Sequence, residues 1–558
     1  MFGLLLHTLR SFSRRERIVF FGALAVAVLS FPILFFHFID QTTVAVPAYG
    51  GSYTEGIVGQ LGFVNPVLAR PGTPDQDVTS LVFASVSDIA QSIKHNGDMT
   101  SWDVRLKDGA VWQDGTPITS DDIIFTVRTI QDKNTASPLE TDWQNITAAR
   151  VSEREVSFQM PTPYAFFPTL LENLRPIPKK IFAPVDPANI KISAYNLQPP
   201  LGSGPYAFAD IQKRADGFIT SYTLTRAPSY ATIGQRPYID TLTFKFFQND
   251  QALTHAFNYG EIDGFGTFDP LAPDALRIKP ITRLVPTGKY YALFFNQAAR
   301  PTLADLAVRH ALTLSTNRQD IINNILHGDA QPEYGPIPPA ILSSLGLNDR
   351  SLATNFDPTQ AKSILTADGW KQDPQTNLWT KQTGKTIDTL SFTIKTADAF
   401  PLRDIAQVIK QNWESIGIQT NIVLVDPATI NDSIIRPRNY EMLLFGNIVT
   451  KNPDIFSFWH SSQQFDPGLN FSLYQNPAVD KMITTLRTTD DQNIIATTID
   501  TLQNTIAKDM PAIFLVSPDY LYITTERTPG ITVPFIALPV DRFATIASWY
   551  VNTTRILK

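Results

Sequence analysis

The feature that most constrains this chain is an apolar run from residue 18 to residue 39, interrupted only by Ser30 and His37. A helix rises about 1.5 Å per residue, so the run is about 33 Å long and can cross a hydrocarbon core of roughly 30 Å. The apolar regions of secretory signals are usually shorter. The run therefore predicts a membrane helix that is retained in the mature protein, and a cleaved secretory signal is the alternative.

The charges around this run predict its orientation. Arg10, Arg14, Arg15 and Arg17 precede it, and no matching basic cluster follows Asp40. Because basic flanks stay in the cytoplasm, we expect a cytoplasmic tail at 1–17, a single-pass anchor in the cell membrane at 18–39, and the remaining chain on the extracytoplasmic face. A lipid on cysteine cannot serve as the tether, since the sequence has no cysteine.

Composition excludes several classes of function. The chain has 558 residues, 43% of them hydrophobic and 18% charged, which indicates several folded lobes rather than disorder. A net charge of −6 argues against nucleic-acid binding. The histidines show no paired metal-ligand spacing, and no P-loop, Gly-x-Ser-x-Gly or His-Glu-x-x-His motif occurs. We expect no enzyme activity, no metal site and no cofactor.

Beyond a short link at 40–48, strand patterns alternate with helix patterns, which is typical of an α/β protein. The stretch from Trp102 to Trp112 reads as a hairpin. Thr119 is a capping residue for a helix at about 120–131. Asp357 followed by Pro358 starts another helix that Gly369 ends. A helix at 403–415 followed by a strand at 418–425 indicates one arm of a parallel sheet.

Several short motifs follow one another along the chain in a definite order. They are Gly50-Gly-Ser-Tyr-Thr-Glu55, Trp102-Asp-Val-Arg-Leu-Lys-Asp-Gly109, Gly202-Ser-Gly-Pro-Tyr206, Tyr259-Gly-Glu-Ile-Asp263, Asp305-Leu-Ala-Val-Arg309 and Trp459-His-Ser-Ser462. Read together, they resemble the extracellular solute-binding proteins of family 5, the peptide and nickel receptors of ABC importers. The resemblance covers nearly everything after residue 48.

This resemblance implies a two-lobed fold of the periplasmic-binding-protein type (type II, class C), hinged around a cleft. It places lobe 1 at 49–289, with an inserted subdomain at about 86–199. Lobe 2 is expected at 290–513, and residues 514–558 are expected to return to lobe 1.

The function that the resemblance implies is capture of peptides in the cleft and their delivery to permease subunits in the membrane, by a monomer. Two alternatives stay open. In the first, the ligand is a nickel chelate or an oligosaccharide instead of a peptide. In the second, the same two-lobed body serves a sensory or scaffolding role in the envelope without transport.

The resemblance also suggests ligand-contacting residues. Oligopeptide receptors of this family bind the free amine of the peptide through an aspartate, which lies a few residues before a proline in the second lobe. The matching stretch here is Gly446, Asn447, Ile448 and Val449 ahead of Pro453, and Val449 takes the place of the acid. We therefore consider Asp454 or Glu55 as a substitute carboxylate.

Aromatic side chains complete the expected site. The candidates for the cleft lining are Tyr53, Tyr291, Phe294, Trp459 and His460. Their alternative role is ordinary core packing, and that of Glu55 and Asp454 is solvation or helix capping.

Overall fold

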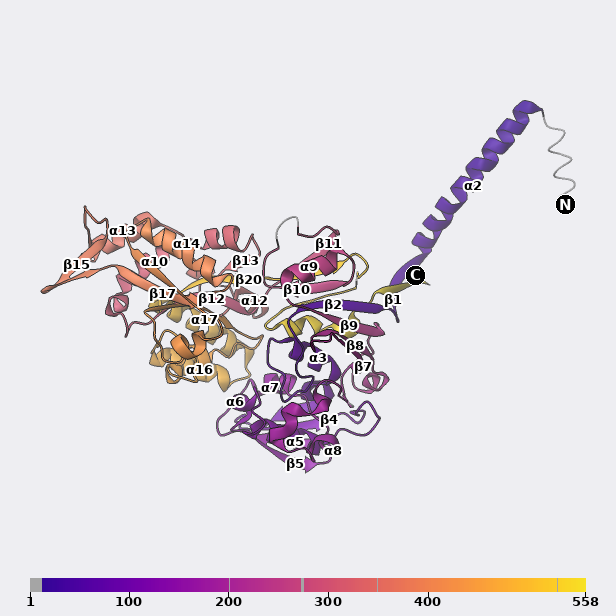
Figure 1. Cartoon of the computed structure of the whole chain (residues 1–558), viewed down its shortest axis with the longest axis horizontal. Helices are drawn as coiled ribbons and strands as arrows, with labels where there is room; N and C mark the ends of the chain where they lie inside the picture. Colours follow the sequence, from indigo (N-terminus) through magenta and orange to yellow (C-terminus); the bar gives the residue numbers. More distant parts are fainter. Residues whose placement is uncertain (1–12, 200, 272–274, 349, 529) are drawn as a thin grey trace.

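Two large sheets organise the computed structural model, which describes residues 13–199, 201–271, 275–348, 350–528 and 530–558. The first has the strand order β11-β21-β10-β2-β9-β8-β7, and the second β13-β20-β12-β19-β17-β18. We call the parts built on them lobe 1 and lobe 2. Figure 1 shows the lobes side by side, with lobe 2 in orange and lobe 1 mainly in indigo and magenta.

The strands of these sheets alternate in burial wherever one face meets water, and central strands are buried on both faces. Lobe 1 contains β2 (Ser52–Val58), β7 (Tyr206–Lys213), β8 (Ile219–Arg226), β9 (Thr241–Phe247), β10 (Gly264–Thr267), β11 (Pro280–Val285) and β21 (Tyr520–Thr525). Lobe 2 contains β12 (Lys289–Phe295), β13 (Ala330–Pro332), β17 (Ser391–Ala397), β18 (Gln419–Val425), β19 (Met442–Ile448) and β20 (Ala512–Pro518).

Smaller sheets and the helices surround them. The strands are β3 (Ala90–His95), β4 (Ser101–Leu106), β5 (Thr147–Ser152) and β6 (Glu155–Gln159), and β14 (Lys371–Gln372), β15 (Trp379–Thr383) and β16 (Thr386–Thr389). The longer helices are α3 (Pro74–Val82), α5 (Ser120–Gln131), α9 (Asp250–Asn258), α10 (Leu306–Leu314), α13 (Pro358–Ala367), α14 (Leu402–Glu414), α16 (Pro477–Arg487) and α17 (Gln492–Asp509). The shorter ones are α4 (Val86–Ile89), α6 (Glu140–Trp143), α7 (Phe167–Asn173), α8 (Lys179–Phe182), α11 (Arg318–Asp320), α12 (Pro339–Ser344) and α15 (Phe456–Trp459).

The local predictions largely agree with these elements. The helix expected at 120–131 is α5, and the backbone N–H of Thr119 donates to Asp122 at 2.9 Å as a capping box requires. Asp357 caps α13, and α14 leads into β18, which runs parallel to β17. The hairpin expected at 102–112 is wrong, because β4 pairs with β3 and β6 in a separate sheet.

Over the residues that the structure describes, the chain crosses between the lobes twice. It leaves lobe 1 after β11 and enters lobe 2 at β12, so residues 286–288 form the first crossing, next to the boundary predicted after 289. It returns between β20 and β21, at Asp519. The boundary predicted after 513 is wrong, because β20 extends to Pro518 and pairs with β12 and β13.

The N-terminal part departs from the predicted link. α2 (Arg14–Thr42) contains the apolar run and continues beyond it, so residues 40–42 are helical. Residues 43–48 form β1 (Thr43–Ala48), which pairs antiparallel with β22 (Asn552–Leu557). The link at 40–48 is thus part of regular elements. The first twelve residues of the expected cytoplasmic tail lie outside the described part of the chain.

Candidate ligand cleft

The two crossings between the lobes are hydrogen-bonded to each other. The Thr287 hydroxyl in the first crossing donates to the Pro518 carbonyl beside the second, at 2.6 Å. The backbone N–H of Val449 donates to the Gly288 carbonyl at 2.7 Å. A Cβ on Gly288 would lie only 1.8 Å from the Val449 oxygen, so this close approach of two backbones requires glycine. Val449 is therefore buried at the hinge.

The loop after Val449, in lobe 2, contacts lobe 1. The Tyr164 hydroxyl, in lobe 1, donates to Asp454 Oδ2 at 3.2 Å, and the Arg487 Nε of α16 lies 3.3 Å from the same oxygen. The Arg487 guanidinium also stacks over the Tyr164 ring, 4.7 Å from its centre. Asn452 donates to the Thr169 hydroxyl. Asp454 thus serves as a contact between the lobes, and its charge is compensated by Arg487.

Strand pairing in lobe 2 sorts the other predicted residues onto opposite faces. Tyr291 pairs with Gly446, and Lys289 pairs with Ile448, so these four share one face of the sheet. Tyr290 pairs with Asn447, whose amide donates to the Tyr290 hydroxyl at 3.0 Å on the opposite face.

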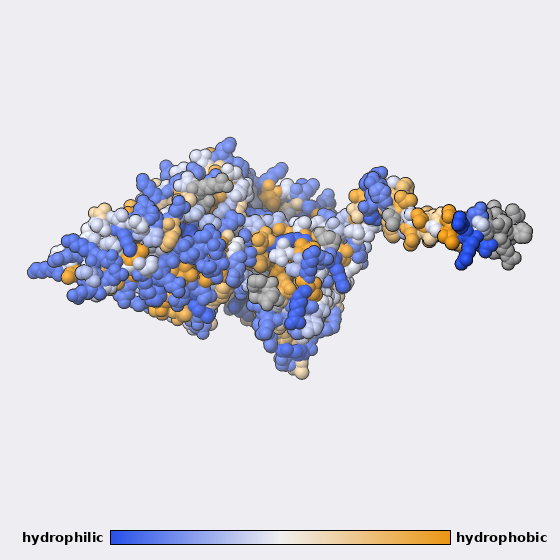
Figure 2. Space-filling view, turned by 90° about the horizontal axis from the view of Figure 1, so that it is seen from above, coloured by the Kyte–Doolittle hydropathy of each residue, from blue (hydrophilic) through white to orange (hydrophobic). Residues whose placement is uncertain are grey.

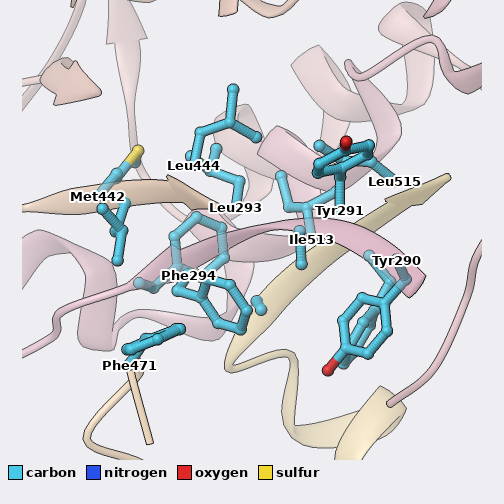
Figure 3. Close-up of a cluster of buried hydrophobic side chains, with 14 of the residues drawn as sticks. Tyr290, Tyr291, Leu293, Phe294, Met442, Leu444, Phe471, Ile513 and Leu515 are labelled. Carbon is cyan, nitrogen blue, oxygen red and sulfur yellow. The ribbon is translucent and has the colours of Figure 1, made fainter. Parts of the chain in front are cut away.

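Phe294 lies on that opposite face and belongs to the hydrophobic core. Its ring centre is 5.3 Å from that of Phe471 and 6.1 Å from that of Trp459. Figure 3 shows Phe294 directed toward Phe471 while Tyr291 points to the other side of the strand. Phe294 and Trp459 are each 1% exposed, so both serve as core residues.

The face with Tyr291 approaches lobe 1. The Lys289 ammonium lies 4.7 Å from the centre of the Phe268 ring, which follows β10 in lobe 1, and 4.9 Å from the Tyr291 ring. Ile448, beside Lys289, is 39% exposed. Tyr291 itself is 5% exposed and packs in the hydrophobic core of lobe 2. We call Phe268, Lys289, Tyr291 and Ile448 the cleft wall, as the candidate surface for a ligand between the lobes. The sequence reasoning missed Lys289 and Phe268, because strand register places Lys289 opposite Ile448 and contact between the lobes brings Phe268 to Lys289.

Glu55 and Tyr53 are fully buried inside lobe 1. Arg542 Nε lies 2.7 Å from Glu55 Oε1, and the hydroxyls of Tyr53 and Tyr522 donate to Oε2 at 3.0 and 2.9 Å. Arg542 Nη2 also meets Asp77 at 2.7 Å. Burial raises the pKa of Glu55, and the charge of Arg542 opposes that rise. Both oxygens of Glu55 are thus used within the core.

His460 is half-buried at the end of α15, where it makes local contacts. Its Nδ1 lies 2.9 Å from the Ser462 hydroxyl, and its ring stacks on Phe456. Among the described residues no group of three His, Cys, Asp or Glu side chains is placed to hold a metal ion. Two surface hollows lie along α13 and beside Trp112, away from the predicted site residues.

The architecture defines a class of protein before any comparison is made. Two α/β lobes joined by a pair of adjacent crossings can rotate about those crossings and enclose a solute between them. The family model for bacterial extracellular solute-binding proteins, family 5 (middle part), matches residues 85–467. The chain belongs to this family of binding proteins of ABC importers.

Individual relatives agree with this assignment. The oligopeptide-binding protein AppA of Bacillus subtilis is 25% identical over 502 residues, covering 87% of this chain and 89% of AppA. The match to the structure of AppA in complex with a nonapeptide covers 91% of this chain and 100% of the AppA chain, with a TM-score of 0.68. The ABC transporter substrate-binding protein CtaP of Listeria monocytogenes is 26% identical, with a TM-score of 0.72 and coverage of 90% and 99%.

A nickel receptor is also similar. The nickel-binding periplasmic protein of Escherichia coli is 25% identical over 351 residues, which span 61% of this chain and 63% of that protein. These relatives are binding proteins rather than enzymes.

Proposed function

We propose that this protein captures peptides between its two lobes and delivers them to an ABC permease, as a monomer held at the extracytoplasmic face by α2. The observation that carries the proposal is the paired crossing at Thr287 and Pro518, around which two lobes with separate cores can close. Similarity to AppA, whose solved complex holds a nonapeptide, supports peptides as the ligand class.

The charges of the site favour recognition of the peptide main chain over recognition of its free amine. Val449 stands at the place of the amine-binding acid and is buried. Asp454 is paired with Arg487, and Glu55 is fully buried with both oxygens hydrogen-bonded inside lobe 1, so neither is free to meet a ligand amine. Extended peptides can instead be held by backbone hydrogen bonds and tolerant pockets.

The test is a thermal-shift assay of the full chain in lipid nanodiscs with peptide pools. A ligand that binds only the folded state raises the unfolding midpoint. We expect similar shifts with free and N-acetylated peptides. A shift with nickel–histidine or a sugar, and none with any peptide, would overturn the ligand class.

A matched pair of variants tests the position of the site. Ile448 on the cleft wall and Leu424 on β18 of the same sheet are each 39% exposed. Ile448→Arg places a long charged side chain on the proposed wall, and we expect it to abolish the peptide-dependent shift. Leu424→Arg should retain that shift. Equal behaviour of the two variants would place the ligand elsewhere.

A further inference from the structure

The membrane helix continues directly into a two-stranded ribbon. α2 ends at Thr42 and β1 begins at Thr43, with no loop between them. β22 runs antiparallel beside β1, and Thr43 pairs with Leu557 at the end nearest the helix. Figure 1 shows α2, β1 and the last segment of the chain converging at one point beside lobe 1. The ribbon therefore links the helix to the body as a pair of strands.

Polar contacts fix β22 to the last turn of α2. The Arg555 guanidinium pairs with Asp40, and its Nε donates to the Thr43 hydroxyl at 2.8 Å. The backbone N–H of Lys558 donates to the Thr42 carbonyl at 3.0 Å, and its ammonium donates to the Asp40 carbonyl at 3.4 Å. Two cations far along the sequence are thus brought to the outer end of the helix.

The depth of this end follows from helix geometry. Thr43 lies four residues beyond Ile39, the last residue of the apolar run, which corresponds to about 6 Å along a helix. The polar layer on each side of a bilayer is roughly 5–8 Å thick. If residues 18–39 fill the hydrocarbon core, Thr43 and its partner Leu557 lie in the headgroup layer.

The side chains at this end suit that layer. Val44, Ile556 and Leu557 are 44%, 50% and 79% exposed, although all three are aliphatic. Arg555 and Lys558 lie beside them and carry positive charge. Aliphatic and basic side chains together are typical of segments that sit at a membrane surface, where the cations meet anionic lipid phosphates. Figure 2 shows the apolar part of α2 standing clear of the body.

The other end of the ribbon is joined firmly to lobe 1. The Tyr49 ring stacks on Tyr238 with 4.7 Å between ring centres, and the Arg236 guanidinium lies 4.7 Å from the Tyr49 ring centre. At Gly51, a Cβ would come within 2.5 Å of the Val551 side chain, so the turn and the strand pack closely. Movement of the ribbon is thus coupled to movement of lobe 1.

We propose that the foot of the ribbon, residues 43–44 and 555–558, is seated in the lipid headgroup layer of the membrane that α2 crosses. This inference rests on the proposed anchorage by α2. The aliphatic side chains contact the acyl boundary and the Lys558 ammonium contacts lipid phosphates, while Arg555 stays paired with Asp40 and holds β22 to the end of α2. The body then stands on two strands at a restricted angle to the membrane, with its cleft at a defined height.

The absence of native cysteine makes a site-specific test direct. Three single-cysteine variants of the full chain carry an environment-sensitive fluorophore: Leu557→Cys at the foot, Val28→Cys within α2, and Ile387→Cys on β16. All three positions are exposed on the protein, so the label does not disturb a core. The proteins are placed in nanodiscs of phosphatidylcholine and phosphatidylglycerol, with and without brominated lipid.

The three labels separate the possible outcomes. We expect bromine to quench the labels at 28 and 557 several-fold more than the label at 387. Quenching at 28 without quenching at 557 would overturn the seated foot and leave the anchor intact. Absence of quenching at 28 would overturn the anchorage itself and, with it, this inference. Peptide binding by the same preparations tests ligand capture independently.

Discussion

Arg542 lies between two buried carboxylates, Glu55 on β2 and Asp77 on α3, with 2.7 Å to each. Arg542→Met would leave both acids buried without a cation, which typically costs about 3–5 kcal/mol. Denaturant unfolding of the full chain in micelles, followed by tryptophan fluorescence, measures the loss. Arg214→Met is the control, because its pair with Asp216 is exposed and worth little. Equal losses in both variants would contradict the role of Arg542.

Asp519, at the second crossing, predicts a pH dependence. Burial, and then the charge of Asp329, raises its pKa to about 6. Between pH of about 4 and 6 the folded state binds more protons than the unfolded state, so the free energy of unfolding falls as pH rises through this window. Since the carboxyl group is partly exposed and screened by solvent, we expect the free energy of unfolding to change by about 1 kcal/mol across this window. This stabilisation is complete below pH 4 and lost above pH 6.

The variant Asp519→Asn should remove that part of the slope when unfolding is measured at a series of pH values. Asp432→Asn, at an exposed position on lobe 2, should leave it unchanged. The quantity compared is the difference between each variant and the parent, because other groups titrate in the same range. A slope that persists in Asp519→Asn would assign it to another group.

At the scale of elements, the first crossing can approach the backbone after β19 closely only because Gly288 has no side chain. Gly288→Ala would place a Cβ 1.8 Å from a backbone oxygen, and the crossing must shift to avoid it. We expect a loss of about 1–3 kcal/mol in stability, together with weaker peptide binding. Gly97→Ala, where nothing lies within 4 Å, is the control. Indistinguishable variants would show that the crossing is not tightly packed.

The elements themselves were accessible to sequence reasoning to different degrees. α5 and α13 were predicted because their caps and apolar spacing are local signals. The hairpin at 102–112 failed, because β4 finds its partners in β3 and β6 instead of the segment that follows it. The link at 40–48 failed for a similar reason, since the partner of β1 lies about 500 residues away in sequence.

For the molecule as a whole, Tyr164 of lobe 1 contacts Asp454 and Arg487 of lobe 2, and these contacts hold the lobes together. Arg487→Gln removes the cation from this cluster and should shift the ligand-free protein toward a more open form. Energy transfer between fluorophores on Val151→Cys and Ile387→Cys reports the change as lower transfer. Arg436→Gln, whose ion pairs stay within lobe 2, is the control. Unchanged transfer in Arg487→Gln would show that closure does not depend on this cluster.

The sequence by itself determined the membrane-length helix, the α/β character and the family, because these depend on apolar length, local periodicity and short motifs that keep their order. Only the tertiary structure decided which residues meet. Glu55 was a candidate ligand contact, but Arg542 pairs with it inside lobe 1. Phe294 and Trp459 were also candidates, but strand register turns Phe294 into the core, where Trp459 of α15 packs against it. Burial and charge compensation arise from contacts between distant segments, and no local pattern encodes them.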